Sequence, residues 1–114
     1  MSRTIKGLIY YENADIPMRR GILSSGRPVV VVCERPSGTA VQVVPITSGN
    51  KAADGRQTHV PISSLRDHSV AVCEQIRTVD FTELSRYPRG FCTEDEIERI
   101  SAVIGKMFGT GIQE

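Results

Sequence analysis

The residues of this sequence that could do chemistry lie at the ends of short apolar segments. Arg27 precedes four valines in GRPVVVV (residues 26–32), and Thr47 and Ser48 end VVPITS (residues 43–48). A forked guanidinium complements phosphate oxygens and stabilises the negative charge that develops on them in a transition state. Arg27 beside a threonine would therefore suit phosphodiester chemistry. Arg27 alone could equally form a cap or an ion pair on the rim of a sheet.

Two predicted strands would bring Arg27 and Thr47 together. Residues 28–34 (PVVVVCE) and 39–46 (TAVQVVPI) are rich in β-branched residues, and the intervening RPSG has the composition of a turn. The two segments are therefore expected to form an antiparallel hairpin, which places Arg27 and Thr47 at the same open end.

Further short strands are predicted at residues 5–12, 58–62 and 70–76, and Pro61 indicates an edge strand. The segment between residues 12 and 26 has no sustained period, which is typical of a binding loop or lid. Five short strands before any strong helix favour a mainly β fold, a small antiparallel barrel or curled sheet.

The end of the chain is expected to be helical. Thr93 and Glu96 have the spacing of a capping box, and the acidic residues of this turn favour the positive end of the helix dipole. Six apolar residues then share one face of a 3.6-residue period, which indicates core packing: Ile97, Ile100, Val103, Ile104, Met107 and Phe108. A weaker pattern predicts a short helical turn within residues 80–86.

Length and composition predict one domain spanning residues 1–114, in the cytoplasm. Hydrophobic residues make up 39% and charged residues 24%, and no apolar run approaches the roughly 18 residues of a membrane span. Three cysteines without a C-x-x-C motif predict neither a disulfide framework nor a zinc site. Cys33 and Cys73 are expected to be buried as small hydrophobic residues, and nothing marks His59 or His68 as a catalytic base.

The charges are unevenly distributed along the chain. Residues 1–57 carry eight basic and four acidic residues, a net +4, whereas residues 58–114 carry six and nine, a net −3. The basic half could meet a polyanion, or the asymmetry could be scatter. Glycine-rich phosphate loops, the H-E-x-x-H motif and the G-x-S-x-G motif do not occur in the sequence. Only 5% of residues are aromatic, which argues against a broad base-stacking platform.

Four segments, VVVV, VVPITS, THVPI and CEQIRTVD, resemble in order and separation the MazF/PemK family of toxin endoribonucleases from bacterial toxin–antitoxin pairs. The resemblance covers roughly residues 5–108, and EQIRTVD is its most specific part. It implies an SH3-like antiparallel barrel with a C-terminal α-helix, a homodimer and a cognate antitoxin partner. It also implies sequence-selective cleavage of single-stranded RNA without a metal or another cofactor.

The resemblance assigns Arg27 and Thr47 as the catalytic pair. In the implied reaction the ribose 2′-hydroxyl attacks the adjacent phosphorus, which gives a 2′,3′-cyclic phosphate and a 5′-hydroxyl end. Arg27 would stabilise the charged transition state, and Thr47 would orient the phosphate or the attacking hydroxyl. Candidate RNA-binding residues are Ser48, Glu74, Arg19, Arg20 and His59.

Two departures from the family pattern leave alternatives open. The first strand has Lys6-Gly7-Leu8 where the family usually has R-G-D or R-G-E, and the loop RGILSSG lacks the acid of the usual G-S-E-Q. An antitoxin-binding member without nuclease activity is therefore one alternative. A gyrase-binding toxin resembling CcdB is another, although the C-terminal GTGIQE lacks an aromatic pair that would suggest such an anchor.

Overall fold

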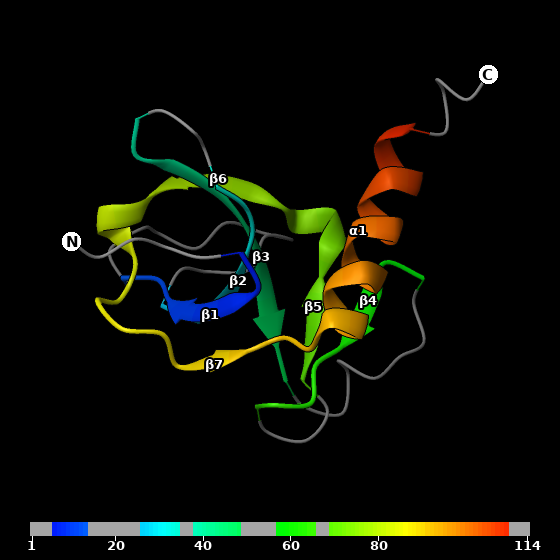
Figure 1. The fold of residues 1–114 in the computed structure, drawn as a ribbon, viewed down its shortest axis with the longest axis horizontal. Helices are drawn as coiled ribbons and strands as arrows, with labels where there is room; N and C mark the ends of the chain where they lie inside the picture. The colour runs from blue at the N-terminus through cyan, green and yellow to red at the C-terminus, as the bar shows by residue number, and fades with distance from the viewer. Residues whose placement is uncertain (1–5, 14–25, 35–37, 49–56, 66–68, 110–114) are drawn as a thin grey trace.

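The computed structural model describes residues 6–13, 26–34, 38–48, 57–65 and 69–109. Within these ranges seven strands form one antiparallel sheet in the order β4-β5-β3-β2-β1-β7, and β6 pairs with β3 beside this path. The strands are β1 (Leu8–Tyr11), β2 (Pro28–Glu34), β3 (Ala40–Thr47), β4 (His59–Pro61), β5 (Val70–Val72), β6 (Arg77–Asp80) and β7 (Gly90–Phe91). Two 3₁₀ turns, η2 (Cys73–Gln75) and η3 (Phe81–Glu83), and the helix α1 (Glu94–Gly109) complete the described elements. Figure 1 shows the sheet curling strongly, with α1 beside β4 and β5. The prediction of a mainly β barrel with a C-terminal helix is confirmed.

The central hairpin is the predicted pair of β2 and β3. Val29 lies opposite Pro45, and Val31 lies opposite Val43. Both faces of β2 are buried because the sheet has a core on each side, which explains its continuous run of valines.

The helix-side core lies between the sheet and α1. Its buried members are Ile9, Val30, Val44, Ile46, Val60, Ile62, Ala71, Cys73, Cys92 and Ile100. The barrel core lies on the opposite face, inside the curl of β1, β2, β3 and β6. Its buried members are Tyr10, Val29, Val31, Val41, Val43, Val79 and Leu84.

The curl closes through contacts between β1 and the chain that follows β6. Glu12 forms an isolated bridge with Leu84, and the Ser85 amide donates to the Tyr11 carbonyl at 2.7 Å. The first strand is thus shorter than predicted, and Glu12 lies at the point of closure.

The strand predicted over residues 70–76 is confirmed only for Val70–Val72, and its extension to residue 76 is wrong. β5 ends at Val72, η2 follows, and β6 is a separate strand on β3. Ile46 faces Ala71 and Val43 faces Arg77, so three steps along β3 correspond to six steps along the partner chain. The turn η2 takes up the surplus residues.

Cys33 is exposed, which contradicts its predicted burial, whereas Cys73 is buried as expected. The pairing of β2 with β3 shifts register between Val31 and Cys33. This irregularity breaks the alternation of side chains and turns Cys33 outward. Strand β7 was not predicted, because two residues carry no periodic signal.

The predicted capping box of α1 is confirmed. The Glu96 amide donates to the Thr93 hydroxyl at 3.1 Å, and the Thr93 amide donates to Glu96 at 3.0 Å. Phe108 is an exception to the predicted apolar face, since it is 65% exposed on the last turn. The helices of the described ranges are all too short or too polar to cross a membrane.

The predicted turn after residue 80 is the 3₁₀ turn η3, and Asp80 caps it. The Asp80 carboxylate accepts from the Thr82 amide at 2.9 Å and from the Thr39 hydroxyl, while Glu83 accepts from the Asp80 amide at 3.1 Å. The hydrogen bond from Thr39, followed by those from Thr82, lowers the pKa of Asp80 below its ordinary value.

Candidate functional site

Glu12, Arg27 and Thr47 form a row across three neighbouring strands. Tyr11 pairs with Pro28, so one step further along the two strands Glu12 lies opposite Arg27; the Glu12 amide donates to the Arg27 carbonyl there at 3.1 Å. Val29 of β2 pairs with Pro45 of β3, so two steps further toward the end of β3 Arg27 lies opposite Thr47. Opposed residues share a face of the sheet. The row therefore lies on the same face as the barrel core, at one end of it. We call this end, together with Arg77, the mouth of the barrel.

Arg77 reaches the mouth of the barrel from β6. It lies opposite Val43, two residues before Val79, and thus on the face of the barrel core. Its Nε donates to Glu12 Oε2 at 3.0 Å, and its Nη2 donates to Glu12 Oε1. The Glu12 side chain is only 3% exposed and that of Arg77 is 24% exposed. A buried carboxylate is thus bound at both oxygens by a half-buried guanidinium.

The electrostatic environment of Arg27 is set by the same residues. Burial is the main cause that lowers the pKa of Arg27, the nearby charge of Arg77 lowers it further, and Glu12 opposes both. Arginine remains a cation in proteins at neutral pH. A half-buried cation beside a hydroxyl can bind a phosphate and donate to oxygens that gain charge.

Glu74, in the turn η2, meets His59 of the edge strand β4. His59 Nε2 lies 3.5 Å from Glu74 Oε2. Burial opposes ionisation of Glu74, but hydrogen bonds from Thr58 and a backbone amide, together with His59, lower its pKa overall. Thr47 pairs with Val70, and Val70 pairs with Pro61, so Thr47 and Pro61 share a face of the sheet. His59 lies two residues before Pro61 on β4 and therefore shares that face. From the spacing of strands and the rise per residue, the backbones of His59 and Thr47 are roughly 12 Å apart.

The remaining predicted site residues are placed in part. Ser48 is exposed directly after β3, next to Thr47. Arg19 and Arg20 lie outside the described residues, as do His68 and the loop of residues 14–25.

Sequence reasoning missed the role of Glu12 at the site and its partner in Arg77. One signal was available for Glu12: it continues the alternation of Leu8 and Tyr10, so a strand period places its carboxylate on an apolar face. The partner could not be identified in this way, because Arg77 is 65 residues away.

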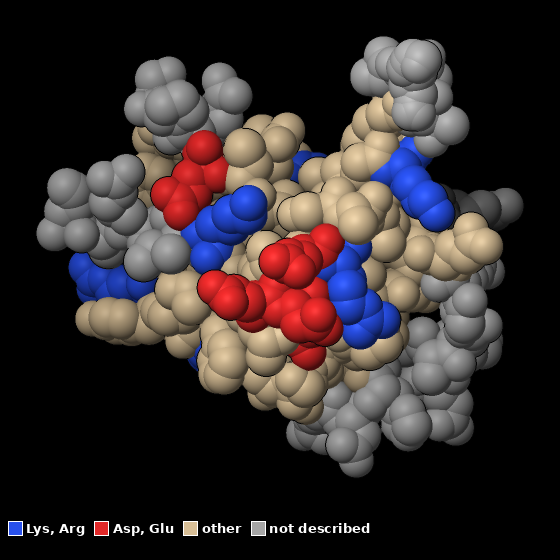
Figure 2. Space-filling model, turned by 45° about the vertical axis from the view of Figure 1, so that its right-hand side comes forward, with Lys and Arg blue, Asp and Glu red and all other residues tan. Residues whose placement is uncertain are grey.

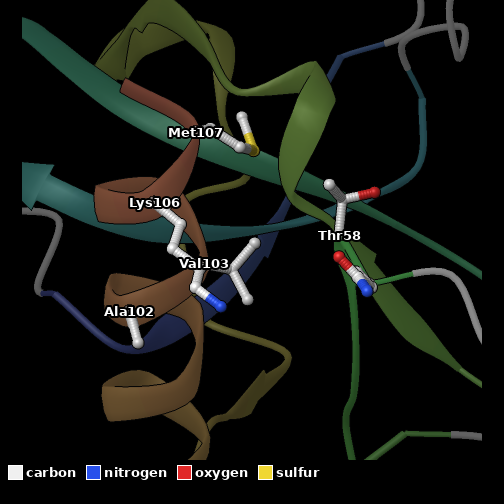
Figure 3. A pocket seen from close by; sticks show the side chains of 6 residues that line it. Thr58, Ala102, Val103, Lys106 and Met107 are labelled. Atoms are coloured by element: carbon white, nitrogen blue, oxygen red, sulfur yellow. The ribbon is translucent and has the colours of Figure 1, made fainter. Parts of the chain in front are cut away.

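Two other surface features lie away from the mouth of the barrel. A groove between α1 and the start of β4 is lined by Gln57, Thr58, Ala102, Val103, Lys106 and Met107, and in Figure 3 Val103 and Met107 face Thr58 across it.

The first turn of α1 contains Glu94, Asp95 and Glu96. Figure 2 shows acidic side chains gathered near the middle of the face that it views, with Lys and Arg side chains beside them. Acidic side chains repel a polyanion.

Within the described ranges, His, Cys, Asp and Glu side chains do not gather in groups of three or more that could hold a metal ion.

Comparisons with known proteins identify the family. Residues 6–108 match the family described as PemK-like, MazF-like toxins of type II toxin–antitoxin systems. A search of curated protein sequences found no match.

The fold is similar to those of several solved structures. The Mycobacterium tuberculosis toxin MazF-mt6 is 25% identical, with a TM-score of 0.68 over 90% of this chain and 96% of that one. An endoribonuclease from a mycobacterial species is 18% identical, with a TM-score of 0.71 over 96% and 94%. The Deinococcus radiodurans MazE–MazF complex contains a chain that is 19% identical, with a TM-score of 0.62 over 96% and 98%. From its sequence match over residues 6–108, this chain belongs to the PemK-like, MazF-like toxins of type II toxin–antitoxin systems.

Proposed function

We propose that this chain is a sequence-selective endoribonuclease that cleaves single-stranded RNA without a metal and thereby inhibits growth. The observation that carries the proposal is the register of β2 and β3, which sets Arg27 opposite Thr47 at the mouth of the barrel. Membership of a toxin family in which a structural neighbour is named an endoribonuclease supports it.

The proposed reaction is a transesterification at phosphorus. The ribose 2′-oxygen bonds to the adjacent phosphorus as its proton passes to solvent water, and the bond from phosphorus to the 5′-oxygen breaks. The products are a 2′,3′-cyclic phosphate and a 5′-hydroxyl, so the leaving oxygen gains a proton. The Arg27 guanidinium stabilises the charge on the phosphate oxygens, and Thr47 orients the phosphate or the attacking hydroxyl. The leaving 5′-oxygen takes its proton from solvent or from the Arg27 guanidinium, which then regains a proton from water.

RNA selectivity is proposed to come from polar residues around this pair. Ser48 follows Thr47 on the exposed end of β3 and can donate to a phosphate or a base. Glu74 is partly exposed and held ionised by its neighbours, so it can accept from a base amino group. His59 supports Glu74, and Arg19 and Arg20 would contact the backbone.

The proposed assembly is a homodimer that a cognate antitoxin inhibits. Among the described residues the short strand β4 ends the strand order of the sheet, and a strand at a sheet edge suits pairing between copies. The Deinococcus MazF structures with bound MazE support an antitoxin partner. Sedimentation velocity of the purified chain should give the mass of a dimer. Added antitoxin should form a stable complex and suppress cleavage, whereas a monomer or an indifferent antitoxin would contradict this part of the proposal.

The activity test uses a long single-stranded RNA in EDTA, with the cut ends mapped. Cleavage at a short recurrent sequence with 5′-hydroxyl ends is expected. Loss of one well-placed donor usually lowers the rate on the order of 10²–10³-fold, so Arg27→Ala should lose cleavage while circular dichroism shows it folded. Arg99→Ala, at an exposed position on α1, is the matched control and should cleave normally.

Intact RNA with the native chain would contradict nuclease activity and would favour a family member that only binds antitoxin. Cleavage that requires added divalent ions would contradict the metal-independent mechanism. Normal cleavage by Arg27→Ala would show that the site lies elsewhere.

A further inference from the structure

Glu12 stands between two arginines at the mouth of the barrel. Its carboxylate is buried, bound at both oxygens by Arg77, and next to Arg27 in the row across β1 and β2. We propose that Glu12 is a positioning residue that holds the Arg27 guanidinium beside Thr47 through its fixed negative charge. The expected effect of Glu12 on catalysis rests on the proposed function. Its expected effect on the position of the Arg27 guanidinium rests only on the geometry at the mouth of the barrel.

The first step of the argument concerns like charges. Arg27 and Arg77 both extend onto the face of the barrel core, and each is partly withdrawn from water. Two guanidiniums so placed repel each other, and the side chain with more freedom would swing toward solvent. The carboxylate of Glu12 offsets this repulsion, because it is bonded to Arg77 and its charge also acts on Arg27, the next residue in the row.

The second step concerns rigidity. Arg77 holds the Glu12 carboxylate with two hydrogen bonds in a fork geometry, which fixes its orientation as well as its position. The Glu12 backbone is also held, since its amide bonds to Arg27 and its strand bridges to Leu84. Arg27 therefore faces a negative charge that cannot move away, and its guanidinium is held in place before RNA binds. The rate of a reaction falls steeply when a catalytic group of this kind is displaced.

The third step separates Glu12 from the reacting atoms. Its side chain is 3% exposed and both of its oxygens already accept from Arg77. Glu12 is thus poorly placed to touch RNA or to take the 2′-hydroxyl proton. Its effect on the reaction is expected to act through Arg27.

The test compares Glu12→Gln with Glu98→Gln, a matched change at an exposed position on α1. Glu12→Gln keeps the size of the side chain and removes its charge. It should lower kcat on the order of 10- to 100-fold and leave KM within about 2-fold, because RNA binding does not use Glu12. Glu98→Gln should not change either constant. A Glu12→Gln enzyme with native kcat would overturn the proposal.

A double-variant comparison distinguishes positioning from a general structural role. If Glu12 acts through Arg27, Glu12→Gln should change the residual single-turnover rate of Arg27→Ala by less than about 2-fold. An equal loss in both backgrounds would show that Glu12 merely maintains the fold and would overturn the proposal.

A spectroscopic arm works even if the native chain does not cleave RNA. In nuclear magnetic resonance spectra, Glu12→Gln should shift the Nε–Hε signal of Arg27, assigned by its loss in Arg27→Ala. An unchanged signal would overturn the positioning role, whereas intact RNA with the native chain would overturn only the proposed function. If Glu12→Gln does not fold, Glu12→Asp keeps the charge but draws it back by one methylene, and it should still shift the Arg27 Nε–Hε signal from its native position; an unchanged signal would overturn the positioning role.

Discussion

Removing the arginine that binds Glu12 should destabilise the protein strongly. In Arg77→Met the side chain still fills the mouth of the barrel, but the Glu12 carboxylate, whose side chain is 3% exposed, loses both of its hydrogen bonds from Arg77. Breaking a buried ion pair in this way leaves an uncompensated charge and typically costs about 3–5 kcal/mol. Arg27 remains nearby and opposes part of the loss, so we expect about 3 kcal/mol.

This loss is large against the total stability of about 5–15 kcal/mol for a small domain. Chemical unfolding in urea, followed by circular dichroism, measures it directly. With a slope of about 2 kcal/mol per molar urea, the midpoint should fall by about 1.5 M. Arg99→Met, an exposed change on α1, is the control and should alter stability by less than about 0.5 kcal/mol.

The double variant Glu12→Gln with Arg77→Met sharpens the reasoning. A neutral amide is easier to bury than a carboxylate, so the double variant should be more stable than Arg77→Met alone, by about 1–3 kcal/mol. A loss below about 1 kcal/mol for Arg77→Met is typical of exposed ion pairs. That result, or a double variant no more stable than the single one, would refute the buried pair at the mouth of the barrel.

Three further predictions test other parts of the structure. Burial raises the pKa of Cys73 and Cys92 to about 12, so only about one in 10⁴ of these two thiols is ionised at pH 8. A thiol reagent should therefore rapidly label only the exposed Cys33 among the three cysteines, and Cys33→Ser should abolish that rapid labelling. Thr93→Ala removes the cap of α1 and should lower the free energy of unfolding by about 1 kcal/mol in urea titrations. The pKa of Asp80 is lowered from 3.8 by its hydrogen bonds, so its contribution to stability is complete well above that value and is lost as the pH falls through the lowered pKa. The stability advantage of the native chain over Asp80→Asn should therefore shrink below about pH 4 and stay constant from pH 6 to pH 8.

Local signals predicted most of the fold. The ends of β2 and β3 follow from β-branched runs and a turn within residues 28–47, and the start of α1 follows from the Thr93 capping box. Each of these depends on residues close in sequence. The exposure of Cys33 and the break after Val72 could not be predicted in this way, because both depend on the register of one strand against another.

The same distinction separates the two halves of the candidate site. Arg27 and Thr47 belong to one hairpin, so a local prediction of its strands already places them opposite each other. Glu12 and Arg77 meet only because the sheet curls until β1 contacts the chain beyond β6. The pair that reacts with RNA in our proposal is thus set by local pairing, whereas the charge that holds Arg27 is supplied by closure of the barrel. Variants that loosen the closure at Leu84 should therefore reduce cleavage before they unfold the β2–β3 hairpin.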